Sequence, residues 1–373
     1  MAPAQQSVTI CEEVETILKR RLINDTEDMA DIDIKNPVIR EAERVFDKVT
    51  NEPEFDLKKY EAMDFKPKFK WPDLTVQISL HLVTIYGFYL IFSNQIRFYT
   101  TLFLLATIYT SGFGITAGVH RLWSHKAYRA KLPLRILLAF LFTITGQRDI
   151  YTWALDHRVH HKYTETAADP HDVRRGFWFA HVGWLVQTPH PAVEDRRAAL
   201  RKTSVDLLAD PVVRIQKLLF IPLFALLNIV LPMWIPWYFW SETLVNAFVV
   251  SFVTRFTITL NIAFCVNSFA HLWGNKPYDR FMKPVENSIV SLAALGEGWH
   301  NYHHVFPWDY RTSELGRINI STNFIDAFAK LGWAYDLKAA TPAMIISRAN
   351  RSGDGTFGEE EEPEPCPNNN LTK

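Results

Sequence analysis

Four long apolar segments constrain the fold of this 373-residue chain more than any other feature of its sequence. Residues 74–92 and 98–118 form one pair, and residues 217–239 and 244–266 form another. Each segment approaches the roughly 20 residues that a helix needs to cross about 30 Å of hydrocarbon. The joint within the second pair, LPMWIPWYFWSE, is rich in Trp and Tyr, which is typical of a membrane interface. We therefore expect an all-α integral membrane protein with four transmembrane helices.

The order of these segments determines which parts of the chain share a side of the membrane. Two hairpins with short joints place both termini and residues 119–216 together. Residues 134–145 are apolar but too short to cross, so they predict an interfacial or re-entrant helix. Arg255 lies inside the fourth span, which is costly unless it faces protein or a polar ligand. The positive-inside rule makes the shared side cytosolic because basic residues flank the spans there, namely Lys66, Lys68, Lys70, Arg121, Lys126, Arg129, Lys131 and Arg135.

The two ends of the chain differ from this core in composition. Residues 1–70 are polar and predict a cytosolic arm with short helices near residues 11–20 and 37–50, and with no signal peptide at its start. Residues 71–340 would form the membrane domain, and residues 341–373 a disordered cytosolic tail. Three scattered cysteines give no disulfide framework, and the formal net charge of zero gives no sign of nucleic-acid binding.

Most of the histidines gather in four short clusters on the predicted cytosolic side. Imidazole is the commonest protein ligand for redox-active metals, and nine imidazoles exceed what one ion accepts, so the clusters predict two metal ions at the membrane surface. The clustered residues are His120, His125, His157, His160, His161, His271, His300, His303 and His304. We interpret the other four histidines as ordinary surface or hydrogen-bonded residues, namely His81, His171, His181 and His190.

Helical spacing divides the clustered histidines between the two ions. Residues four apart share a helix face, so His157 and His161 would bind one ion together. His160 points about 100° away from His161 and would face the other ion. The HNYHH cluster repeats this spacing, with its middle histidine, His303, directed away from the other two.

The first cluster does not fit this rule. His120 and His125 are one residue too far apart for a helical pair, which predicts a bend in the segment between them. Nearby carboxylates would orient imidazoles by accepting the second ring N–H. The candidates for this role are Asp156, Glu165, Asp169 and Glu297.

The clusters and their flanks resemble the membrane acyl-CoA desaturases. HRLWSH follows GITAG, HRVHH precedes ADPH, and the last cluster stands within GEGWHNYHHVFPWDY. The likeness runs from about residue 65 to residue 335 and is strongest to the stearoyl-CoA (Δ9) type, insect members included. It implies four transmembrane helices with a cytosolic helical cap that carries a di-iron site.

The resemblance also implies the reaction and its partners. The nine clustered histidines would hold two iron ions (Fe²⁺) on the cytosolic face of the endoplasmic reticulum membrane, and Asn267 would approach through a water. O2 would remove two hydrogens from the chain of a fatty acyl-CoA, with electrons from cytochrome b5 and its NADH-dependent reductase. The sequence contains no HPGG haem-binding motif, so cytochrome b5 would be a separate partner. No catalytic side chain beyond the metal ligands is implied.

Four substrate-binding positions follow from the same resemblance. Gln147 and Trp153 match residues at the bend of the acyl tunnel, and Arg255 matches an arginine of the fourth span. Gly112 falls where the family closes the far end of the tunnel. The missing side chain there would admit C18 as well as C16 chains.

The contacts to the CoA headgroup differ from those of vertebrate relatives. Those relatives read QNDVYEWARDHR where this chain reads QRDIYTWALDHR, so that Arg148 replaces an asparagine and Leu155 an arginine that contacts the CoA phosphates. Arg148 is predicted to serve the same phosphates, and so are the basic residues Arg196, Arg197, Arg201 and Lys202. A solvated basic loop is the alternative for this group.

The position of the double bond is a separate question. KPVE at residues 283–286 favours Δ9 and saturated C16 and C18 substrates. The alternatives are another regiospecificity, such as that of Δ11 pheromone-type enzymes, and a membrane di-iron fatty acyl hydroxylase. A metal transporter is disfavoured because its ligands would lie within the spans, where only His81 is found.

Overall fold

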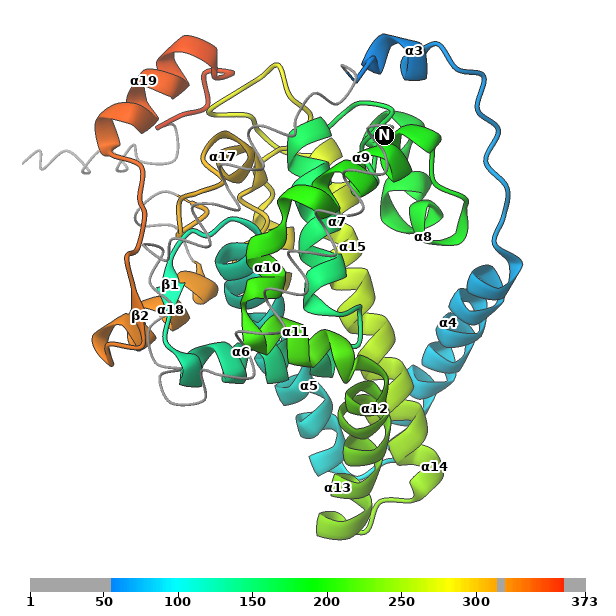
Figure 1. Ribbon diagram of the computed structural model, residues 1–373. Coiled ribbons are helices and arrows are strands. Elements are labelled where there is room, and N and C mark those ends of the chain that lie inside the picture. Colours follow the sequence, from blue (N-terminus) through cyan, green and yellow to red (C-terminus); the bar gives the residue numbers. More distant parts are fainter. Residues whose placement is uncertain (1–54, 314–318, 359–373) are drawn as a thin grey trace, which may run out of the picture. The chain divides into compact units, whose positions relative to one another are not determined.

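Four long apolar helical rods carry a cap of shorter helices (Figure 1). The structure is a computed structural model, and it describes residues 55–313 and 319–358. The helices predicted near residues 11–20 and 37–50 therefore lie outside the described residues.

The rods confirm the four predicted spans, because each is long and apolar enough to cross a membrane. The second and fourth run further towards the cap than hydropathy predicts, to Ser124 and Leu272. Those added turns carry histidines. The segments that build the four rods are, in chain order, α4 (Trp71–Phe92); α5 (Phe98–Phe113) with η1 (Gly114–Ser124); α12 (Phe220–Phe224), η4 (Ala225–Val230) and α13 (Leu231–Trp240); and α14 (Leu244–Asn246), η5 (Ala247–Thr254) and α15 (Arg255–Leu272).

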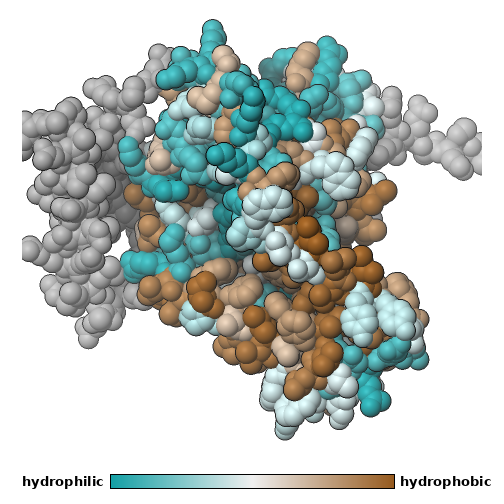
Figure 2. Space-filling model, turned by 90° about the vertical axis from the view of Figure 1, so that its right-hand side faces the viewer, coloured by the Kyte–Doolittle hydropathy of each residue, from teal (hydrophilic) through white to brown (hydrophobic). Residues whose placement is uncertain are grey.

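The surface of the rods suits a hydrocarbon environment. Figure 2 shows apolar side chains over the end of the molecule formed by the rods and polar side chains over the cap. On α4, for example, Leu82 and Ile85 are 62% and 65% exposed. Burial of apolar side chains within a water-soluble core does not account for such a surface, so the chain is a multi-pass membrane protein.

The cap consists of short helices that follow the second and fourth rods. Two-residue strands, β1 (Arg129–Ala130) and β2 (Ala334–Tyr335), pair antiparallel and join its two parts. The helices after the second rod are α6 (Leu132–Thr145), α7 (Ile150–Tyr163), η2 (Val173–Arg175), η3 (Phe179–Gly183), α8 (Trp184–Val186), α9 (Pro191–Thr203), α10 (Val205–Ala209) and α11 (Pro211–Leu218). The others are α3 (Leu57–Glu61), α16 (Ser288–Ala293), α17 (His300–Val305), α18 (Ile320–Lys330) and α19 (Pro342–Ser352).

The main hydrophobic core lies where α6 and α7 pack against η1. The short apolar helix predicted at residues 134–145 is α6, and it ends at Gly146, whose φ of 68° favours glycine. Asp149 then starts α7 by accepting a hydrogen bond from the N–H of Thr152. Leu138, Phe142 and Ile150 are fully buried in this core. The core thus determines how α7, which carries three histidines, faces η1.

One prediction about the ends of the chain differs from the structure. Residues 341–373 were expected to be disordered as a whole, but α19 occupies Pro342–Ser352. Its Ile345 and Ala349 pack against Tyr278 and Tyr302. This burial of apolar side chains, which the polar composition of the tail does not indicate, stabilises the helix. The rest of the tail, residues 359–373, lies outside the described residues.

Candidate metal centre

Five imidazoles from three helical segments converge within the cap. His120 and His125 come from η1 and its end, His157 and His161 from α7, and His303 from α17. Their ligand nitrogens all lie within 4.8 Å of one another. Nε2 of His303 lies 2.9 Å from Nε2 of His120 and 3.0 Å from Nε2 of His161, and the Nε2 atoms of His125 and His157 are 2.8 Å apart. We refer to these five residues as group one.

Four further imidazoles form a second set, group two. His160 comes from α7, His271 from α15, and His300 and His304 from α17. Nε2 of His300 lies 3.1 Å from Nε2 of both His271 and His304. Group two adjoins group one, because the rings of His161 and His304 stack with centroids 4.3 Å apart.

The composition of the groups agrees with the division expected from helical spacing. His157 and His161 lie together in group one, while His160 lies in group two. On α17 the pattern is reversed, with His300 and His304 in group two and His303 in group one. Two helices with the same H-x-x-H-H spacing therefore each supply ligands to both groups.

The pair His120 and His125 is brought together by a widened helix rather than by a break. Residues Gly114–Ser124 are π-helical, and the N–H of His125 donates to the carbonyl of His120, five residues earlier, at 3.1 Å. In such a helix residues five apart take the place that residues four apart have in an α-helix. The predicted bend is thus replaced by a π-helical turn.

Two of the four candidate carboxylates hold the imidazoles. Oε2 of Glu297 lies 2.9 Å from Nδ1 of His120, and Oδ1 of Asp169 lies 2.8 Å from Nδ1 of His160. The other two candidates have different partners. Asp156 binds Arg197, and Glu165 accepts from the N–H of Lys283.

The two groups have the properties of metal sites rather than of histidines that hydrogen-bond to one another. Burial lowers the pKa of His157, His161 and His303 well below the ordinary value, so these imidazoles are neutral and able to bind a metal. A histidine that binds a metal through Nε2 carries its N–H on Nδ1, and in His120 and His160 a carboxylate faces Nδ1. Nε2 of His120 faces Nε2 of His303 at 2.9 Å, and Nε2 of His160 is buried without a hydrogen-bond partner among the described residues; a cation would satisfy both atoms.

The separations between the nitrogens support the same fit. Ligands at right angles around an ion with bonds of ~2.1 Å to imidazole nitrogen lie ~3.0 Å apart. The shortest Nε2–Nε2 distances, between neighbouring imidazoles of each group, are 2.8 to 3.1 Å. The residues that would hold two ions are therefore the nine histidines of groups one and two.

A family model described as fatty acid desaturase matches residues 96–335, which is well over half of the chain. The chain belongs to the fatty acid desaturase family. Members of this family are oxidoreductases that desaturate fatty acyl chains, so the chain is an oxidoreductase of this class.

Curated members of this family are similar to the chain over most of its length. An acyl-CoA Delta-9 desaturase of Acheta domesticus is 48% identical over 294 residues, which are 78% of this chain and 81% of that protein. An acyl-CoA Delta12-desaturase of the same species is 49% identical over 78% of this chain and 82% of the relative. The stearoyl-CoA desaturase of Homo sapiens is 46% identical over 78% of this chain and 80% of the relative.

Two predicted substrate residues of this desaturase lie beside group one. The indole N–H of Trp153 donates to Oε1 of Gln147 at 2.9 Å, and the Trp153 ring stacks on His157 with centroids 5.0 Å apart. Asn267 lies one turn before His271 on α15.

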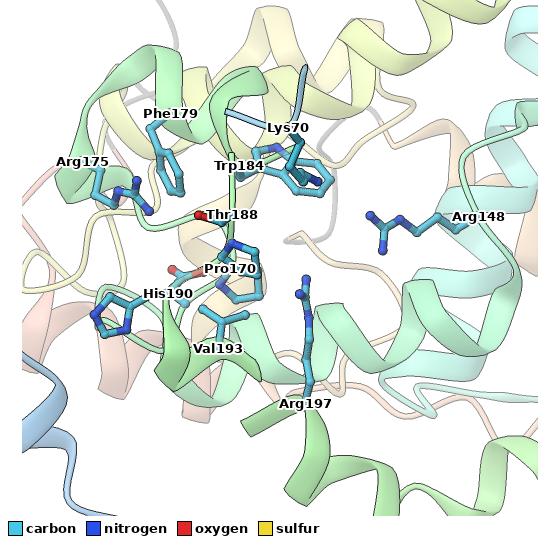
Figure 3. A pocket seen from close by; sticks show the side chains of 12 residues that line it. Lys70, Arg148, Pro170, Arg175, Phe179, Trp184, Thr188, His190, Val193 and Arg197 are labelled. Atoms are coloured by element: carbon cyan, nitrogen blue, oxygen red, sulfur yellow. The ribbon is translucent and has the colours of Figure 1, made fainter. Parts of the chain in front are cut away.

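The predicted headgroup residues of the desaturase surround two adjoining hollows. Arg148 and Arg197 line both, and Figure 3 shows their guanidinium groups pointing into the first hollow. The second is a groove of about 440 Å³ that also contains Arg201 and Lys217. Arg196 instead lies beside Asp195 and over the ring of Tyr163. Leu155 is 3% exposed and belongs to the hydrophobic core, and it lines the second hollow as an apolar residue among the charged ones.

The remaining two predicted substrate residues have protein neighbours. Arg255 is fully buried and donates to the carbonyls of Ser251 and Ile144 and to Asn228. At Gly112, an added Cβ would lie 2.8 Å from Cδ1 of Leu295, so this leucine fills the space that the missing side chain leaves.

Sequence reasoning missed the part that Arg121 plays in the site. From the sequence alone, Arg121 is only a positive charge near the membrane. In the structure it is fully buried and binds Oε1 of Glu297 through Nε and Nη2. It also donates to the carbonyl of Tyr310 and to Oδ1 of Asn319. Its place next to His120, inside a cluster of metal ligands, was the only signal in the sequence.

Proposed function

We propose that the protein is an acyl-CoA desaturase that introduces a cis double bond at Δ9 into saturated C16 and C18 acyl-CoA. It acts on the cytosolic face of the endoplasmic reticulum membrane, with both termini cytosolic. It uses O2, and its electrons come from cytochrome b5 and the NADH-dependent reductase of cytochrome b5. One turnover converts the saturated acyl-CoA, O2, two electrons and two protons into the alkene and two molecules of water.

The observation that carries the proposal is the pair of all-histidine groups at the cap end of four apolar rods. The identity with acyl-CoA desaturases over most of the chain supports acyl-CoA as the substrate. Two iron ions held by these groups supply the oxidising power that an unactivated methylene pair requires. The residues that would hold the ions are His120, His125, His157, His161 and His303 for one and His160, His271, His300 and His304 for the other. Asn267 would reach its ion through a water, as the resemblance to the family implies.

The protein itself contributes orientation and exclusion of water. Trp153 and Gln147 form the wall beside group one against which the reacting carbons lie. The cationic groove around Arg148 and Arg197 binds the phosphates of CoA, and Asp156 holds the two arginines in place through contacts of 3.5 Å and 2.7 Å. The headgroup thus anchors the chain at one end while Trp153 fixes its middle.

Expression in a yeast that lacks its own Δ9 desaturase tests the proposal. We expect growth without added oleate and the appearance of C16:1 and C18:1 with the double bond at Δ9, located chemically. A His160→Ala variant, matched in expression, is the inactive control. Abundant, iron-loaded protein that forms no unsaturated product would refute the proposed activity.

The same assay distinguishes the alternatives. Relatives of nearly equal identity include a Delta12-desaturase of Acheta domesticus and an (11Z)-hexadec-11-enoyl-CoA conjugase of Bombyx mori, so another regiospecificity is the second candidate. Double bonds at Δ11 or Δ12 in place of Δ9 would support it. An alcohol as the main product would identify a hydroxylase.

Chain-length preference should respond to a side chain at position 112. In Gly112→Leu the new side chain must displace Leu295, which is only 3% exposed, and both then occupy the end of the acyl site. We expect the ratio of C18 to C16 products to fall about 10-fold, the usual effect of one or two methylenes in an apolar pocket. Gly112→Ala should give a smaller fall. Fatty acid profiles of the yeast strain measure both, and an unchanged ratio in Gly112→Leu would contradict the assignment.

A further inference from the structure

Three buried polar side chains from three other helical segments hold the connection between α6 and α7. They are Gln216 of α11, Asn228 of η4 and Arg255 of α15, and they are 4%, 0% and 0% exposed. In Figure 1, α11 and α12 lie against α6, and α15 runs beside them. The connection contains no metal ligand, yet it precedes the helix that supplies three.

The contacts cover both ends of this connection. Arg255 Nη1 donates to the carbonyl of Ile144 at 2.6 Å, and Asn228 Nδ2 donates to the carbonyl of Thr143 at 2.6 Å. On the other side, Oε1 of Gln216 accepts from the N–H of Ile150, the first residue of α7, at 3.0 Å, while its Nε2 donates to Oγ1 of Thr143. The last turn of α6 and the first residue of α7 are thereby fixed to one another.

Asn228 and Arg255 act together. Arg255 Nη2 donates to Oδ1 of Asn228 at 2.8 Å. A Cβ at Gly146 would lie 2.8 Å from the same oxygen, so only glycine at the left-handed turn allows Asn228 this close. The glycine between α6 and α7 therefore leaves the room that the side-chain amide of Asn228 needs.

A contribution to folding stability does not explain why an arginine is buried at position 255. Its partners are the carbonyls of Ser251 and Ile144 and the amide of Asn228, all neutral, and burial of an arginine without a carboxylate is costly. Its charge instead faces the carbonyl end of α6, where the helix dipole is negative. Such an arrangement favours one position of α6 over others.

The position of the connection between α6 and α7 in turn determines the position of Trp153. Gln147 lies within the held connection, and its Oε1 accepts the indole N–H of Trp153. The Trp153 ring in turn stacks on His157 of group one at 24°. A displacement of the connection would therefore move Trp153, which forms the wall beside group one against which the reacting carbons lie.

We propose that Gln216, Asn228 and Arg255 are positioning residues that determine which methylene pair of the acyl chain is desaturated. The proposal rests on the proposed acyl-CoA desaturase function. Successive methylenes along the chain are separated by little more than 1 Å, a displacement that alone changes reaction rates about 100-fold. Loss of the network would let neighbouring carbons react as well.

Two conservative variants of the full chain test this. Asn228→Asp keeps the oxygen that Arg255 needs and removes the N–H that binds the carbonyl of Thr143. Gln216→Glu keeps the acceptor for Ile150 and removes the N–H towards Thr143. The matched control is Thr257→Val, since Thr257 is equally buried on α15 and bonds only to its own helix, at the carbonyl of Val253.

We expect both variants to retain the wild-type iron content while the fraction of double bonds at neighbouring positions rises about 10-fold, with no change in Thr257→Val. Variants that keep iron and form the wild-type double bond alone would overturn the proposal, whatever their rate. If Asn228→Asp fails to fold, Gln216→Glu, outside the four spans, decides by the same readout. A wild-type chain that forms no alkene would refute the proposed function instead, and this proposal with it.

Discussion

A His303→Ala variant is expected to bind fewer than two iron ions per chain and to lose at least about 100-fold of its desaturase activity. Nε2 of His303 lies 2.9 Å from that of His120 and 3.0 Å from that of His161, so it adjoins the ligands of both η1 and α7. Removal of a residue that merely orients a ligand already costs 10–100-fold in metal affinity or activity. Removal of the ligand itself should cost at least as much.

Metal analysis of the purified protein and product formation in microsomes would check this expectation. His181→Gln is the matched control, because His181 is a part-buried histidine outside both groups, hydrogen-bonded to Ser268 and Asn261. It should keep both ions. Two ions per chain in His303→Ala would show that group one is not a metal site.

Much of this site could be predicted from the sequence because its determinants are local. The spacing of His157, His160 and His161 within one helix decides which of them face the same way, whatever the rest of the chain does. The spans are equally local, since about 20 apolar residues suffice to define one. For this reason the division of the histidines into groups agrees with the structure.

Other features depend on contacts between distant segments and could not be predicted. Glu297 lies 176 residues after Arg121, and no local sequence pattern around either residue predicts that they pair. Among Asp156, Glu165, Asp169 and Glu297 the sequence offered no way to choose, because orientation of an imidazole requires a match in space. The same holds for Leu295 beside Gly112.

Arg255 illustrates how a correct local inference leaves the partner open. Its position in a span predicts that it faces protein or a polar ligand. The structure supplies protein acceptors from α6, η4 and η5, three segments that no motif connects. A residue that sequence comparison places near the substrate is here bonded to the backbone that carries the substrate wall.

Glu297→Gln should weaken both the metal site and the fold, and this separates it from Asp169→Asn. Burial raises the pKa of Glu297, but Arg121 and His120 lower it by more, to about 2, so the carboxylate is ionised at any physiological pH. It is the carboxylate partner of the fully buried Arg121. Asp169, by contrast, accepts only from His160 and from the N–H groups of Glu165 and His171.

The glutamine variant leaves the charge of Arg121 buried without its counter-ion, which costs about 3–5 kcal/mol of folding free energy. It also loses the negative partner of His120, which lowers metal affinity by 10–100-fold. Asp169→Asn should show only the second effect. Thermal unfolding of the detergent-solubilised, metal-free proteins isolates the first effect, and titration with a competing chelator measures the second. An equal fall in melting temperature for both variants would mean that the Arg121–Glu297 pair does not stabilise the fold independently of the metals.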